Sequence, residues 1–134
     1  MILVDTSVLI DYFKGIESGP AKLFDELVEH GIPYGINTFI YQELLQGSKT
    51  IHEFNTLKEY LETIPFYDLK YGKESYEKAA FLNFQCRKNG ITIRSTIDVL
   101  IAEIAIENNL LLLHNDSDFD KMSKVIKELK IYGE

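Results

Sequence analysis

The sequence predicts an α/β fold, a three-layer sandwich in which helices cover both faces of a central, mainly parallel sheet. Short apolar, β-branched runs alternate along the chain with longer segments whose apolar residues recur at helical spacing. This alternation implies parallel strands joined by helical crossovers. The chain has 134 residues, 46% of them hydrophobic, and no linker, repeat or low-complexity stretch. A single domain over residues 1–134 is therefore expected.

The first elements are predicted from an apolar run and three capping residues. Residues 2–4 are apolar and β-branched, as in a buried strand. Asp5 and the two hydroxyl residues after it form a helix-cap signal, so a helix is expected to follow directly. Pro20 suits the first turn of a second helix, and Gly31 ends that helix.

The middle of the chain continues the alternation. A short second strand is predicted at residues 32–36, followed by a helix that Asn37 caps and Gly47 ends. Residues 51–61 form another amphipathic helix. Residues 64–69 are predicted as a third strand, and the proline within them makes this an edge strand or a strand start.

The last part of the chain contains the most apolar strand. A long helix is expected at residues 71–88 and a second at 97–107. The unbroken apolar run at 110–113 indicates a central parallel strand. Residues 114–120 are polar and turn-like, and residues 125–131 fit a short helix, a strand or both.

Composition limits the classes of function. The net charge of −7 argues against a protein that binds nucleic acid through a broad basic surface. It permits acidic residues concentrated in a metal site. The single cysteine, Cys86, excludes an internal disulfide and fits a reducing compartment. No basic leader and no membrane-length apolar run are visible, so a cytoplasmic protein without a membrane partner is expected.

Four acidic residues stand out, although each has an ordinary structural explanation. Asp5 and Asp116 each follow an apolar strand, so both are expected at one edge of a parallel sheet, yet both also suit a turn or cap. Glu43 alone fits a solvated helix residue. Asp98 lies three residues after Ser95, which matches a capping box, and in a first turn the helix dipole favours its charge.

Taken together, the four acidic residues favour a functional role over a purely structural one. Glu43 and Asp98 emerge from strongly apolar helices, and carboxylates removed from water are costly unless a positive group compensates. No buried lysine or arginine in these motifs matches them. Clusters of carboxylate oxygens suit hard cations such as Mg²⁺ or Mn²⁺. For His114, a hydrogen-bonded structural role is favoured over metal ligation.

Four segments of the chain also carry a family resemblance. They are residues 4–7 (VDTS), 43–47 (ELLQG), 90–102 (GITIRSTIDVLIA) and 112–119 (LLHNDSDF). In these segments, taken in order and spacing, the sequence resembles the PIN (PilT N-terminus) domain, in particular the VapC-type toxins of bacterial toxin–antitoxin pairs. The resemblance implies a PIN-like fold and a metal-binding, catalytic acidic quartet made of Asp5, Glu43, Asp98 and Asp116.

The same resemblance implies supporting residues. Asp118 matches an additional acidic position that assists the metal, and Thr6 matches a small hydroxyl residue that orients water or a carboxylate. Asn115 stands in the polar position before the fourth acid. Arg94 precedes the helix of Asp98, where it either holds an RNA phosphate through paired hydrogen bonds or packs its stem on an aromatic side chain at the surface.

The implied function is that of a metal-dependent endoribonuclease, the toxin component of a type II toxin–antitoxin system, which hydrolyses RNA phosphodiester bonds with Mg²⁺ or Mn²⁺. Its implied partners are RNA, a cognate antitoxin held by the early helices, and a second copy of the chain in a homodimer. One alternative is a receiver-like Mg²⁺-binding signalling module, which would need a lysine after a late strand. Another is a catalytically idle PIN-like binding protein, which the intact acidic pattern argues against.

Overall fold

The sheet at the centre of the molecule is parallel throughout. The computed structural model describes residues 1–133. Its strands are β1 (Ile2–Val4), β2 (Tyr34–Gly35), β3 (Leu111–Leu113) and β4 (Lys130–Ile131), in the order β2-β1-β3-β4. β1 and β3 are the central pair, in register from Ile2 opposite Leu111 to Val4 opposite Leu113. The predicted parallel sheet, with residues 110–113 at its centre, is confirmed.

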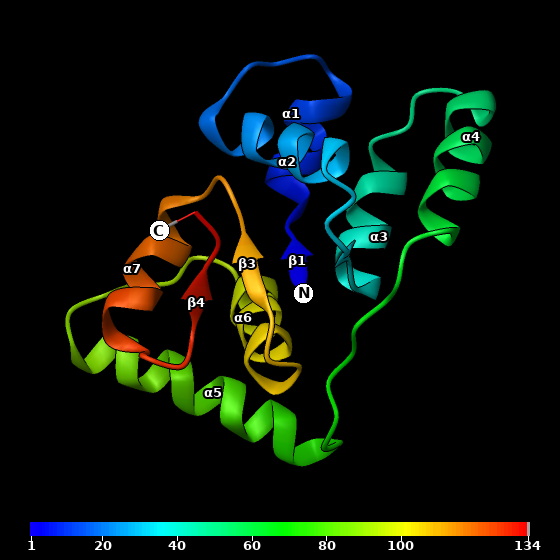
Figure 1. The fold of residues 1–134 in the computed structure, drawn as a ribbon. Coiled ribbons are helices and arrows are strands. Elements are labelled where there is room, and N and C mark those ends of the chain that lie inside the picture. The colour runs from blue at the N-terminus through cyan, green and yellow to red at the C-terminus, as the bar shows by residue number, and fades with distance from the viewer. Residues whose placement is uncertain (134) are drawn as a thin grey trace.

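Helices surround this sheet in two groups (Figure 1). Helices α1, α2 and α3 pack together beside β1, and α5, α6 and α7 pack together on the side of β3 and β4. Helix α4 packs against α3 and, through Tyr60, also touches Phe13 of α1 and Tyr34 of β2. The helices are α1 (Thr6–Phe13), α2 (Gly19–Glu29), α3 (Thr38–Gln46), α4 (Ile51–Glu62), α5 (Lys73–Lys88), α6 (Thr96–Glu107) and α7 (Ser117–Val125).

Most helix starts are those that the capping residues predict. The side chain of Asp5 accepts a hydrogen bond from the backbone N–H of Ser7 at the start of α1. Asn37 accepts one from the N–H of Ile40 at 2.9 Å and begins α3. Such caps satisfy backbone donors that a helix start leaves free. The exception is Ser95, whose side chain makes no capping bond, so the capping box expected with Asp98 is not formed.

The prediction of a strand at residues 64–69 is wrong. This segment forms only one bridge, between Ile36 and Phe66, with the N–H of Tyr67 donating to Ile36 O at 2.8 Å. Pro65 has no N–H to offer a neighbouring strand, and the segment lies at the outer edge beyond β2, so pairing is not extended.

The structure also specifies the form of two stretches near the end of the chain. Residues 114–120 are not all turn, because Asp116 caps helix α7, which begins at Ser117. The open choice for residues 125–131 resolves to both forms, the end of α7 followed by β4. Among the aromatic residues in the first half of the chain, Phe24 is fully buried, whereas Phe13 and Phe54 are exposed.

The central strands deliver the acidic residues to one edge. The backbone N–H of Asp5 donates to Leu113 O at 2.9 Å, so β1 and β3 end side by side. The chain leaves both strands at their carboxyl ends, where parallel sheets form their binding sites. Within residues 1–133, no helix combines the length and apolar composition needed to cross a membrane.

Candidate metal centre

Asp5 lies at the carboxyl end of β1, and its carboxylate accepts two hydrogen bonds from Ser7. Its side chain is only 6% exposed. The Ser7 hydroxyl donates to Asp5 Oδ2 at 2.7 Å, and the Ser7 backbone N–H donates to the same oxygen at 3.2 Å. Burial raises the pKa of Asp5, and the Ser7 hydrogen bonds act in the opposite direction. Asp5 is therefore both a helix cap and a fixed carboxylate facing the site.

Asp98 is surrounded by the negative charges of other carboxylates. It lies in the first turn of α6 and is half-buried. Burial, and then the charges of four other carboxylates, together raise its pKa to about 7; these carboxylates are Asp5, Asp116, Asp118 and Glu43. Several negative groups therefore share one small region, and their mutual repulsion favours the neutral form of Asp98.

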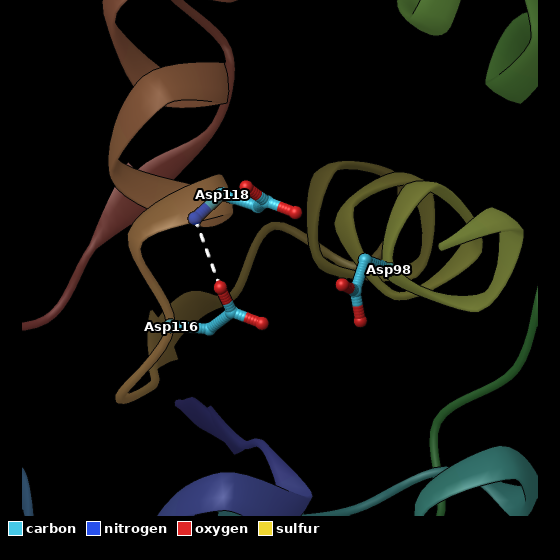
Figure 2. A group of neighbouring side chains, drawn as sticks. All are labelled: Asp98, Asp116 and Asp118. Carbon is cyan, nitrogen blue, oxygen red and sulfur yellow. Dashed lines mark hydrogen bonds between the residues drawn. The ribbon is translucent and has the colours of Figure 1, made fainter. Parts of the chain in front are cut away.

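Asp116 and Asp118 complete a group of three carboxylates with Asp98 (Figure 2). Each of the three offers an oxygen, and these oxygens all lie within 4.8 Å of one another. Figure 2 shows that Asp98 comes from α6 and that the other two come from the start of α7, with all three facing a common space. Asp116 Oδ1 accepts from the N–H of Asp118 at 3.0 Å, and Asp118 is only 2% exposed.

Glu43 and Thr6 lie close to Asp5. Glu43 is exposed on α3 and does not belong to the group of three. Burial of its carboxyl and then the charge of Asp5 raise its pKa. Its charge in turn raises the pKa of Asp98. The Thr6 hydroxyl is buried and faces Glu43, whose pKa it lowers, but it makes no hydrogen bond of ordinary geometry within residues 1–133.

Arg94 contacts the acidic group directly. Its Nε lies 3.2 Å from Asp118 Oδ2, and its Nη2 lies 3.9 Å from Asp116 Oδ1. Its backbone N–H also points to Asp118 Oδ2, at 3.4 Å. The side chain is 73% exposed. Arg94 is thus at the site edge, as expected, but its guanidinium pairs with carboxylates.

His114 and Asn115, which lie next to the acidic group, make structural contacts. Both ring nitrogens of His114 have partners, because Nδ1 accepts from the N–H of Asp116 at 3.0 Å and Nε2 lies 3.2 Å from Asp120 Oδ1. This matches the structural role expected for His114. The side chain of Asn115 donates to Asp11 Oδ2 at 2.9 Å, so Asn115 binds α1 and does not join the group of three.

Sequence reasoning missed Ser7. Its hydroxyl donates to Asp5 and also accepts the backbone N–H of Asn115 at 3.0 Å, which joins the ends of β1 and β3. The available signal was a hydroxyl two residues after a cap aspartate, a position from which it reaches back to the carboxylate.

The donor set fits a hard divalent cation. Every acidic group is a carboxylate, the ligand type that Mg²⁺ and Mn²⁺ prefer, and the charges of these groups raise the pKa of Asp98. The buried Thr6 hydroxyl, which faces Glu43, gives an ordered ligand or water a further contact. The class that fold and site define is therefore a parallel α/β protein with an oxygen-only acidic centre at the ends of its central strands.

Comparison with known proteins places the chain within that class. The family model of the PIN domain matches residues 2–125, and the chain belongs to the PIN domain family. It is 29% identical to VapC ribonuclease Mb1587 of Mycobacterium bovis over 126 residues, 93% of each chain. Ribonuclease VapC11 of Mycobacterium tuberculosis matches with the same identity and coverage.

Solved structures share the fold at lower identity. One is VapBC2 from Rickettsia felis bound to a DNA fragment from its promoter, with a TM-score of 0.72 and 20% identity over 98% of this chain and 97% of that one. Another is VapBC-1 from nontypeable Haemophilus influenzae, with a TM-score of 0.71 and 23% identity over 98% and 96%.

Proposed function

We propose that this protein is a metal-dependent endoribonuclease and the toxin of a type II toxin–antitoxin pair. The observation that carries the proposal is the convergence of carboxylates at the carboxyl ends of β1 and β3, with the pKa of Asp98 raised to about 7 by its burial and its acidic neighbours. Membership of the PIN family and the ribonuclease names of the relatives support it. The proposed site of action is the cytoplasm, where RNA is available.

In this proposal Asp5, Glu43, Asp98 and Asp116 are the catalytic acids and hold Mg²⁺ or Mn²⁺, with Asp118 as an additional ligand. A bound divalent ion supplies acidification of a water and neutralisation of charge on the phosphate. Asp98 and Asp116 approach from different elements, so they fix the position of the cation relative to the sheet edge. Asp5 is kept in place by Ser7.

The remaining residues position water and RNA. The buried hydroxyl of Thr6 has a free hydrogen-bonding capacity, which we assign to a carboxylate or a water. Arg94 is exposed beside the carboxylates, where its guanidinium can bind a phosphate next to the scissile bond. Asn115 supports the loop before Asp116 by holding it against Asp11 on α1.

An antitoxin and a second copy of the chain are the proposed protein partners. The solved relatives in the VapB–VapC complexes support the antitoxin. Helix α4 exposes Ile51 and Phe54 and buries only Leu61 fully, so its outer face is available for an apolar partner segment. The ring of Phe13 packs edge-on against Tyr60, which brings the end of α1 beside α4. This joint apolar surface is the proposed antitoxin groove.

The receiver-like alternative has no observation in its favour. It requires a lysine at the acidic centre, whereas the cation whose ion pairs reach Asp116 and Asp118 within residues 1–133 is Arg94.

The deciding experiment is cleavage of total cellular RNA by purified protein with Mg²⁺, with Mn²⁺ and with EDTA, followed by mapping of the new RNA ends. Cleavage that requires a divalent ion and is abolished in Asp5→Asn and Asp98→Asn is expected. Asp68→Asn, which changes an exposed aspartate before α5, is the matched control. Near-normal RNA cleavage by either site variant would overturn the assignment of these residues as catalytic acids.

A further inference from the structure

Arg94 occupies the same carboxylates that a metal would use. Its guanidinium reaches Asp118 Oδ2 through Nε at 3.2 Å and Asp116 Oδ1 through Nη2 at 3.9 Å. Asp116 and Asp118 are two of the three residues whose oxygens lie within 4.8 Å of one another. A cation of this chain therefore stands beside the group most suited to a divalent ion.

The position of Arg94 matters because the carboxylates beside it carry excess negative charge. Four acidic neighbours raise the pKa of Asp98, and Arg94 is the basic side chain that forms ion pairs with this group. One guanidinium offsets a fraction of that negative charge, and a divalent ion offsets twice as much. Carboxylate oxygens that coordinate a hard cation lose much of their capacity to pair with a guanidinium.

The geometry also lets Arg94 leave. Its side chain is 73% exposed, and it lies in the non-helical segment 91–95 between α5 and α6. The backbone N–H of Arg94 points to Asp118 Oδ2 independently of the guanidinium. The side chain can therefore swing away while the backbone keeps the segment close to Asp118.

We propose that Arg94 is an exchangeable counter-ion: in the metal-free protein it pairs with Asp116 and Asp118, and a divalent cation displaces it and frees it to bind the RNA phosphate. This inference rests on the proposed nuclease function. It adds a competition between a residue of the chain and the metal, which makes Arg94 a positioning residue that lowers metal affinity and favours RNA binding.

The first test measures Mn²⁺ affinity without RNA, by isothermal titration or by the electron paramagnetic resonance signal of free Mn²⁺. Arg94→Gln is expected to bind Mn²⁺ roughly three- to tenfold more tightly than the wild type, the range that an exposed, screened unit charge near a divalent ion suggests. Arg94→Lys keeps the charge and should stay within about twofold, because Coulomb attraction depends on charge. The matched control is Arg87→Gln at the exposed end of α5, which should not change the affinity.

The second test follows the wild-type protein alone. The chain has two arginines, Arg87 and Arg94, so their side-chain Nε signals are readily assigned in a ¹⁵N NMR spectrum. Saturating Mg²⁺ is expected to shift the Arg94 Nε signal and to speed its hydrogen exchange, while the Arg87 signal stays unchanged. A static Arg94 signal at metal saturation contradicts the exchange.

The outcomes separate this inference from the function on which it rests. Mn²⁺ affinity in Arg94→Gln that equals or falls below that of the wild type overturns the competition, whether or not RNA is cleaved. Tighter binding by Arg94→Gln supports it, even if the wild type cleaves no RNA. Absence of Mn²⁺ binding by both proteins overturns the metal site and the inference together.

Discussion

The hydroxyl of Ser7 lies 2.7 Å from Asp5 Oδ2 and donates a hydrogen bond to it. The same hydroxyl accepts the backbone N–H of Asn115 at 3.0 Å. A single small side chain therefore connects the carboxylate after β1 to the loop after β3. The site at the sheet edge depends on this connection as well as on the acidic residues themselves.

Replacing Ser7 by alanine should weaken both stability and catalysis. Asp5 would lose its side-chain donor, and the N–H of Asn115 would lose its acceptor. The expected loss is about 1–2 kcal/mol in the free energy of unfolding, measured by urea denaturation. RNA cleavage should fall because Asp5 is less firmly held. Ser48→Ala, whose hydroxyl has no hydrogen bond within residues 1–133, is the control, and equal stability of the two variants would contradict the role of Ser7.

Asp98→Asn should stabilise the metal-free protein while it abolishes cleavage. Its carboxyl has a pKa of about 7 because of burial and then the repulsion of Asp5, Asp116, Asp118 and Glu43. At pH 8 in EDTA the aspartate is mostly charged, and the asparagine removes that repulsion. The melting temperature should rise by a few degrees, as for a change of about 1 kcal/mol. A lower melting temperature than the wild type at this pH would refute the electrostatic explanation, and Asp68→Asn should leave it unchanged.

Glu103 should make stability depend on pH far from the metal centre. It is 4% exposed on α6, and burial, then a hydrogen bond and the charge of Glu107, raise its pKa to about 8. The unfolded state releases this proton near the ordinary value of 4.5, so its contribution to stability is lost as pH rises from about 4.5 through 8. The slope from one such group is at most about 1.4 kcal/mol per pH unit.

The measurement compares urea unfolding of the wild type and Glu103→Gln between pH 6 and pH 9. Glutamine supplies an N–H donor toward Glu107 in place of the O–H of protonated Glu103, and Glu107 Oε2 is buried without a hydrogen-bond partner within residues 1–133. The contributions of Asp5 and Asp98 to the stability of the fold also fall with rising pH in EDTA. The test is therefore the difference in the free energy of unfolding between the two proteins. That difference should shift in favour of Glu103→Gln as pH rises, and a constant difference would contradict the prediction.

Gly35→Ala should destabilise the fold at the edge of the sheet. A Cβ atom there would lie 2.6 Å from Pro65 O and 2.5 Å from the ring of Tyr67, and backbone cannot move as a flexible side chain does. The expected cost is about 1–3 kcal/mol in the free energy of unfolding, as for other overpacked sites. Gly19→Ala has open space around its Cβ and begins α2, so it should cost little. Similar melting temperatures for the two variants would rule out this close approach.

Much of the fold follows from local patterns along the chain. The apolar runs at residues 2–4 and 110–113 became the central strands, and Asn37 and Asp5 began the helices that their capping chemistry predicts. These predictions succeeded because strand burial and helix capping depend on residues close in sequence. The edge segment at residues 64–69 failed because its pairing depends on which neighbour remains available beyond β2.

The candidate site divides in the same way. The acidic residues could be picked out from the sequence, and the strand–cap pattern of Asp5 and Asp116 predicted that these two share one sheet edge. Three features depend on the packing of the whole chain: Asp98, Asp116 and Asp118 face one another within 4.8 Å, Ser7 connects two strand ends, and Arg94 pairs with carboxylates. The physical reason is that capping and burial act over a few residues, whereas charge repulsion and ion pairing depend on distances that only the packed chain establishes.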